Sequence, residues 1–191
     1  VEVKSKKSSF FVNHDEEPLK FDKNKILKLF PVFDKNGTIT AANASSLSDG
    51  AATVLVADDD YIKKNNIKPL AKIISHASFA TKPVYFTKAP IYAIQKVLKQ
   101  ANFKINDIDL FEINEAFSCV PMIAIDKLNL DNSKVNVNGG AVSLGHPIGA
   151  SGARIFVTLL NALIERNLKY GIASLCIGGG EASAILIEVC N

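Results

Sequence analysis

The sequence lacks the features that define several large classes of protein. No apolar run reaches the ~20 residues that a membrane span needs, and the start shows no signal-peptide pattern, so we predict no membrane partner. Basic residues number 22 against 19 acidic ones, a net charge of +3. That excess is too small for the positive field with which proteins attract nucleic acid, so we predict no nucleic-acid partner.

Cysteine and arginine are scarce. The three cysteines (Cys119, Cys176 and Cys190) have neither zinc-ligand spacing nor an even number, a pattern typical of a reducing, intracellular compartment. Only Arg154 and Arg166 are arginines among the 22 basic residues, which we attribute first to codon bias. The remaining composition, 48% hydrophobic and 21% charged over 191 residues, is that of about one globular domain. The chain opens at Val1 without a methionine, as expected for a piece of a longer protein.

The chain divides near the turn signal Asn36-Gly37. Residues 1–37 are polar and lysine-rich and predict a loop-rich segment with one short helix. From Thr38 onward, apolar spacing alternates between strand and helix periods, which predicts a layered α/β sheet with crossover helices. The expected strands are 71–78, 108–113, 135–138, 172–176 and 184–189, and the expected helices are 89–100, 115–128 and 151–166.

Two segments combine small or polar residues with element ends. Residues 40–52, TAANASSLSDGAA, are rich in small side chains, which let a backbone approach either a ligand or a packed helix closely. Asn114 follows an expected strand and precedes an expected helix. It is therefore either a ligand-binding group at the carboxyl end of a strand or simply the N-cap of the helix.

Two further segments are rich in glycine. Residues 138–152, NGGAVSLGHPIGASG, present His146 from an irregular loop, which suits proton transfer or binding of an oxyanion. Cys176 ends an expected strand and precedes three glycines, beginning with Gly178. It is placed either as a reactive thiol or as an inert buried one.

Taken together, NEAF, GGAVSLGHPIGASGAR and CIGGG resemble the C-terminal half of the thiolases in nearly the whole chain. TAANAS at 40–45 and Phe86 are similar to the eukaryotic, mitochondrial acetoacetyl-CoA group of that family. The resemblance implies the end of a thiolase loop domain over 1–37. It implies the C-terminal domain over 38–191, a layered αβα fold with a mixed five-stranded sheet. The N-terminal half of a thiolase is then an expected partner.

The resemblance also implies an activity, the acetyl-CoA C-acetyltransferase reaction, in which two acetyl-CoA molecules give acetoacetyl-CoA plus CoA, or the reverse thiolysis. His146 matches the histidine that activates a nucleophilic cysteine and helps to bind the enolate oxygen. Asn114 matches the residue that fixes a water beside that oxygen, and Cys176 matches the cysteine that moves the α-proton. The Gly178 N–H matches a donor of the second oxyanion hole. None of the three cysteines matches the nucleophile, so the chain alone is expected to be inactive.

Ligand contacts follow from the resemblance as well. The family grips CoA with residues that correspond to Lys20, Phe21, Asp22, Lys25 and Ser45. Residues 20–25 also have a plainer interpretation as a solvated charge run, and Lys20 stands where relatives have arginine. No organic cofactor is implied besides the CoA thioester substrate. A potassium ion is implied, held by the backbone carbonyls of Ala41, Ala42, Ala44 and Val142.

Alternatives remain open at this point. One is a degradative 3-ketoacyl-CoA thiolase of fatty-acid β-oxidation, and another is a non-catalytic protein that only binds acyl-CoA or lipid. The related β-ketoacyl synthases use two histidines and lack the CIGGG cysteine. By resemblance we expect a homodimer or homotetramer in the mitochondrial matrix, with the cytosol as the alternative. Ser48 and Glu181 depart from the family pattern, and Glu181 would either raise the pKa of the Cys176 thiol or point to solvent.

Overall fold

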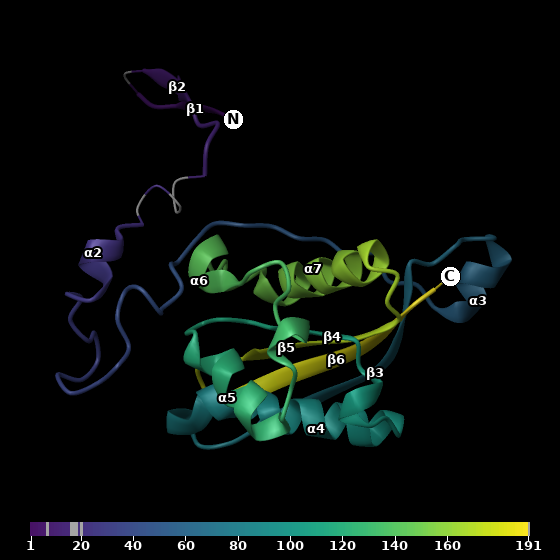
Figure 1. The fold of residues 1–191 in the computed structure, drawn as a ribbon. Helices are drawn as coiled ribbons and strands as arrows, with labels where there is room; N and C mark the ends of the chain where they lie inside the picture. The colour runs from purple at the N-terminus through teal and green to yellow at the C-terminus, as the bar shows by residue number, and fades with distance from the viewer. Residues whose placement is uncertain (7, 16–18, 20, 191) are drawn as a thin grey trace.

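The computed structural model describes residues 1–6, 8–15, 19 and 21–190, and its centre is a four-stranded sheet (Figure 1). The strands lie in the order β3-β6-β5-β4. Their bounds are Ala71–Ala80 for β3, Leu110–Ile113 for β4, Tyr170–Cys176 for β5 and Glu181–Val189 for β6. β4 is parallel to β5, whereas β6 is antiparallel to both of its neighbours. The predicted mixed α/β sheet is confirmed.

Helices cover both faces of this sheet (Figure 1). On one face lie α4 (Ala89–Ala101) and α5 (Cys119–Leu128), and on the other lies α7 (Ser151–Glu165). Each helix buries an apolar stripe, because hydrophobic side chains recur with the helical period in its sequence. At Gly171 of β5 an added Cβ would lie 2.8 Å from carbons of Leu159 and Leu163, so glycine lets α7 pack closely on the strand.

The smaller elements lie outside this layered core. They are β1 (Glu2–Lys4), β2 (Ser9–Phe11), α2 (Lys23–Ile26), α3 (Asp59–Lys64), α6 (Ala141–Leu144) and the 3-10 turns η1 (Pro83–Lys88), η2 (Ile105–Asp107) and η3 (Asn132–Lys134). β1 and β2 form an antiparallel hairpin that the sequence did not predict, because its side chains are exposed and show no alternation. No helix in the described ranges has the length and apolarity needed to cross a membrane.

The sheet has four strands within the described residues rather than the five that we predicted. Of the expected strand at 135–138, only Val135 pairs, in one parallel bridge to Phe111. Asn136 then adopts φ +50°, a left-handed conformation that ends extended structure. Its side chain makes the hydrogen bonds to Ile113 that the backbone of a further strand would make. Oδ1 accepts from the Ile113 N–H at 2.7 Å, and Nδ2 donates to the Ile113 carbonyl at 2.9 Å.

The helix expected from Glu115 begins only at Cys119. The residues before it are extended because the small-residue segment pairs with them: Ala44 bridges Phe117, and the Ser45 N–H donates to the Ala116 carbonyl at 3.1 Å. The N-cap position is Ser118. Asn114 is therefore not a helix cap, which removes the plainer of its two interpretations.

Candidate active site

Asn114 and Cys176 meet at the carboxyl ends of β4 and β5. Ile113 pairs with Ser174 in parallel register, and the Asn114 N–H donates to the Ser174 carbonyl at 3.0 Å. Only 1% of Asn114 and 8% of Cys176 is exposed. Both residues thus lie at the carboxyl ends of neighbouring strands, where α/β folds place ligand-binding groups.

His146 is fixed by the segment 40–52, far from it in sequence. Its backbone N–H donates to the Ser46 carbonyl at 2.9 Å, and it forms a bridge with Leu47. The preceding Gly145 has φ +91°, and an added Cβ would overlap the side chain of Ser48. The glycine is therefore needed both for the backbone angle and for the space, and Ser48 fills that space.

A chain of hydrogen bonds sets the state of the imidazole. The Ser151 hydroxyl, buried at the start of α7, donates to the Pro147 carbonyl at 3.0 Å, so its oxygen accepts from His146 Nδ1 at 2.6 Å. With the proton on Nδ1, Nε2 is an acceptor, and it lies 3.3 Å from Asn114 Nδ2. The tautomer assigned by this network leaves a lone pair on Nε2, as a general base requires.

The local electrostatics favour the neutral forms of both the His146 imidazole and the Cys176 thiol. Burial lowers the pKa of His146, and the positive charge of Arg154 lowers it further. Burial raises the pKa of the Cys176 thiol to about 11, and the neighbouring Cys119 thiol adds to that increase. At neutral pH the imidazole is uncharged and Cys176 carries its proton.

Behind Asn114 lies a buried ion pair that sequence reasoning missed. Arg154 of α7 donates from Nη2 to Asn114 Oδ1 at 3.2 Å, and its Nη1 lies 3.4 Å from Glu112 Oε1. Glu112, on β4, is 2% exposed, and its burial raises the pKa of its carboxyl to about 7 although Arg154 opposes the increase. The one available signal was a charged residue inside the otherwise apolar stretch LFEI, residues 110–113.

Glu115 was also missed, and it joins two loops of the site. Its carboxylate accepts from the Val142 N–H at 3.1 Å and from Asn136 Nδ2 at 3.2 Å. A Cβ on Gly140 would overlap that carboxylate, so glycine leaves room for it. Glu115 thereby ties the GGAVS segment to the end of β4.

The glycine turn after Cys176 is tight and open to solvent. The Ile177 N–H donates to the Glu181 carbonyl at 2.8 Å, and the Gly180 N–H donates to the Ile177 carbonyl at 3.0 Å. Gly178 is exposed and has open space where a Cβ would be. Glu181 Oε2 is buried and faces Gly179, so it does not point to solvent, and Glu181 is not among the causes of the raised Cys176 pKa.

The residues matched to the CoA grip lie apart from this cluster. Phe21 is 67% exposed, Asp22 caps α2 by accepting from the Asn24 N–H at 2.9 Å, and Lys25 pairs with Asp22 at 3.4 Å. Lys20 lies outside the described residues. α2 stands clear of the sheet and its covering helices (Figure 1). Ser45 is close to the site, and its hydroxyl donates to the Ala116 carbonyl at 3.0 Å.

The four carbonyls matched to a potassium site come from two loops, and both loops contact the NEAF segment. Ala44 bridges Phe117, and the Val142 N–H donates to Glu115, so both loops attach to the NEAF segment. Within the described backbone, the carbonyls of Ala41, Ala42 and Ala44 accept no hydrogen bond outside regular elements. Carbonyl oxygens with free lone pairs are the donor type that potassium takes in proteins, so these residues fit the ion.

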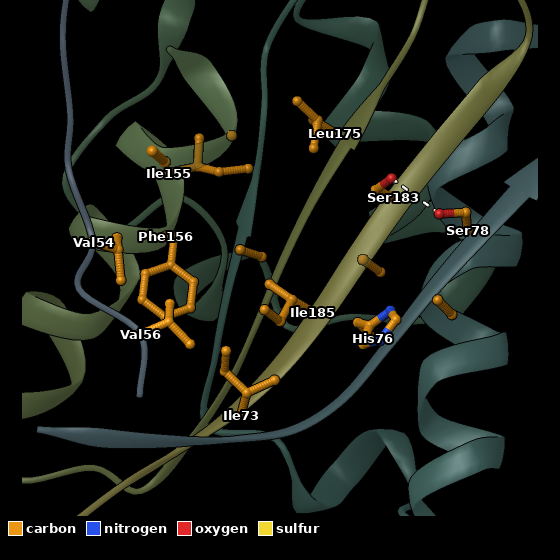
Figure 2. A pocket seen from close by; sticks show the side chains of 15 residues that line it. Val54, Val56, Ile73, His76, Ser78, Ile155, Phe156, Leu175, Ser183 and Ile185 are labelled. Atoms are coloured by element: carbon orange, nitrogen blue, oxygen red, sulfur yellow. Dashed lines mark hydrogen bonds between the residues drawn. The ribbon is translucent and has the colours of Figure 1, made fainter. Parts of the chain in front are cut away.

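An apolar hollow of about 400 Å³ lies on the α7 side of the sheet (Figure 2). Val54 and Val56, from the extended segment before α3, line it together with Ile73, Phe156 and Ile185. Leu55 between them is 95% exposed. This segment has an apolar strand composition but no strand partner within the described part of the chain, so the surface around the hollow is that of an incomplete core.

Comparisons with known proteins fit this geometry. The family model described as "Thiolase, C-terminal domain" matches residues 67–189, and "Thiolase, N-terminal domain" matches residues 1–60. A mitochondrial acetyl-CoA acetyltransferase of Bos taurus is 54% identical over 183 residues, 95% of this chain and 43% of that protein.

Two solved structures are similar throughout. The Bacillus anthracis acetyl-CoA acetyltransferase has a TM-score of 0.91 at 40% identity, with 99% of this chain and 48% of that chain covered. Human mitochondrial 3-ketoacyl-CoA thiolase in complex with CoA has a TM-score of 0.84 at 38% identity, with 97% and 47% covered. The chain spans less than half the length of the curated relatives it matches. On the C-terminal family match, which covers most of its length, this chain belongs to the thiolase family.

Proposed function

We propose that this chain is the C-terminal part of an acetyl-CoA C-acetyltransferase, which forms acetoacetyl-CoA from two acetyl-CoA or cleaves it with CoA. The observation that carries the proposal is the linked set Ser151, His146 and Asn114. It joins a neutral base to a buried amide donor at the carboxyl end of β4, and the Cys176 thiol lies at the carboxyl end of the neighbouring β5. A protein that only bound acyl-CoA would need none of these three in linked positions.

The first step is transfer of an acyl group to a nucleophilic thiol, which we place on the N-terminal half. His146 Nε2 takes the proton of that thiol, and the resulting thiolate attacks the thioester carbonyl and expels CoA. Nε2 thereby changes from an acceptor to an N–H donor. It then donates, beside the amide of Asn114, to the enolate oxygen of the second thioester.

The second step moves the α-proton. In thiolysis the Cys176 S–H gives its proton to the carbon of the leaving enolate. In condensation the CoA thiolate released in the first step takes the Cys176 proton, and the resulting Cys176 thiolate then takes the α-proton of acetyl-CoA. A pKa of about 11 makes the thiol the resting form and its thiolate a strong base. The Gly178 N–H would donate to an acyl oxygen at the second oxyanion hole, and the exposure of Gly178 supports this role.

An N-terminal half completes the molecule in this proposal. The segment Val54–Val56 and the hollow beside Phe156 present apolar surface that a second half would bury, and the matched relatives are more than twice as long. Free carbonyls of the TAANA loop would hold potassium, whose charge would stiffen the two loops around Glu115. Homo-oligomer formation and a mitochondrial matrix location are proposed from the family resemblance. The names of several relatives include "mitochondrial", which supports the location, whereas others name no compartment.

The 191 residues alone are expected to form no acetyl-enzyme, because no cysteine among them is the nucleophile. Incubation with acetyl-CoA followed by intact-mass measurement should show no added acetyl group. The same measurement on a protein that contains both halves should show one. Stoichiometric acetylation of Cys119, Cys176 or Cys190 together with turnover would contradict this assignment.

Turnover by a protein containing both halves tests the proposed activity. We expect thiolysis of acetoacetyl-CoA to exceed that of a sixteen-carbon 3-ketoacyl-CoA by at least ~10-fold in kcat/KM, because a difference of ~1.4 kcal/mol in transition-state binding suffices for that ratio. The reverse preference would support the degradative thiolase. Absence of thiolysis with both substrates, alongside measurable CoA binding, would support the non-catalytic alternative.

A further inference from the structure

The two arginines of this lysine-rich chain lie in α7 or directly after it, and each donates a hydrogen bond to the side-chain oxygen of an asparagine. Arg154 donates to Asn114 Oδ1 at 3.2 Å, and Arg166, the residue after α7, donates to Asn138 Oδ1 at 3.0 Å. Codon bias explains why arginine is scarce but not why arginine stands at these two positions. The planar guanidinium can meet two acceptors in fixed directions, which an ammonium cannot do.

The direction of the Asn114 amide decides what Asn114 can do in the reaction. Turned one way, it presents two N–H donors to the site; turned the other way, it presents an acceptor that would repel an enolate oxygen. A guanidinium has donors only, so Arg154 forces Oδ1 toward itself and leaves Nδ2 toward His146 Nε2.

Glu112 fixes the guanidinium in turn. Its carboxylate is 3.4 Å from Arg154 Nη1 and almost fully buried on β4, two residues before Asn114. Arg154 Nε is buried and has no hydrogen-bond partner in the described part of the chain. A side chain placed only for stability would satisfy that donor as well, because an unpaired buried N–H costs free energy. Here the guanidinium is directed at Glu112 and Asn114 instead.

We propose that Arg154, held by Glu112, is a positioning residue that orients the Asn114 amide toward the reacting oxygen. This inference rests on the proposed acyltransferase function. In this proposal Arg154 acts on the reacting oxygen by orienting Asn114, whose Oδ1 it holds at 3.2 Å. Its removal should therefore affect the enolate step and leave CoA binding unchanged.

The test is a double-mutant cycle in a protein that contains both halves. Arg154→Lys keeps the positive charge but loses the fork, so we expect kcat for thiolysis to fall by roughly 10- to 100-fold, less than the 10²–10³-fold typical of losing an oxyanion donor. KM should stay within about 2-fold. In an Asn114→Ala background the same Arg154→Lys change should have almost no effect on kcat, because the amide that Arg154 orients is gone.

Arg166→Lys is the matched control, since it removes the same kind of bond to Asn138 at the far end of α7, and its kcat should be that of the unaltered protein. If Arg154→Lys is too unstable to purify, Glu112→Gln combined with Arg154→Met removes both buried charges together and should show the same loss of kcat. Unchanged kcat in either variant would overturn the inference, as would equal losses with and without Asn114. An inactive unaltered protein would instead contradict the proposed function.

Discussion

Replacing His146 by alanine is expected to abolish acyl transfer almost completely, with a fall in kcat of roughly 10²–10⁴-fold. Alanine removes the Nε2 lone pair that takes the proton of the nucleophilic thiol and also the N–H that later binds the enolate oxygen. Both losses act on the transition state, so kcat rather than KM should change. The measurement is acetoacetyl-CoA thiolysis by a protein containing both halves.

The pH profile gives the same assignment a second check. Because the pKa of His146 is lowered by burial and by Arg154, the imidazole stays neutral to below the ordinary value of 6.5. Activity should therefore hold as pH falls through 6.5 and decline only at lower pH, and this decline should be absent from the residual rate of His146→Ala. His14→Ala, which changes an exposed histidine of the N-terminal segment, serves as the control. A normal rate in His146→Ala would contradict the assignment of His146 as the general base.

Cys176→Ser should separate the two half-reactions. The serine hydroxyl is a far weaker acid than a thiol, so proton transfer to the enolate carbon should slow by roughly 10²–10⁴-fold. Formation of the acetyl-enzyme uses a different cysteine, so exchange of labelled CoA into acetyl-CoA should persist. The predicted pattern is lost condensation and thiolysis with retained exchange.

Cys190→Ser is the matched control for this substitution, because Cys190 lies beyond β6 near the end of the chain. It should retain all three activities. Loss of exchange together with thiolysis in Cys176→Ser would show that Cys176 carries the acyl group. Retention of full thiolysis would show that another group moves the α-proton.

Sequence reasoning selected the residues that we propose to react but not those that hold them in place. His146 and Cys176 stand beside glycines, and glycine-rich turns after apolar runs are visible without a structure. The layered α/β sheet also followed from strand and helix periods alone. Bonds between distant segments leave no such periodic pattern. The hydrogen bonds between Ser46 and His146 and between Arg154 and Asn114 depend on which elements the fold brings together.

Element ends were predicted least well, and the reason is specific in each case. The helix expected from Glu115 begins later because Ala44 pairs with Phe117, a partner 73 residues away that overrides local helix preference. The expected strand at 135–138 stops because Asn136 adopts a left-handed backbone conformation. Its side-chain amide, instead of its backbone, then makes the hydrogen bonds to Ile113. Neither event depends on the residues of the element alone.

The bonds made by Asn136 have a consequence for the outer edge of the sheet. An edge strand with free N–H and C=O groups can add a strand from another molecule and so start aggregation. On β4 that row is filled by one residue: the Asn136 backbone N–H donates to the Phe111 carbonyl at 2.9 Å, and its amide satisfies both groups of Ile113. Asn136 thus protects this side of the sheet, and the chain beyond it is free to form the loop that carries His146.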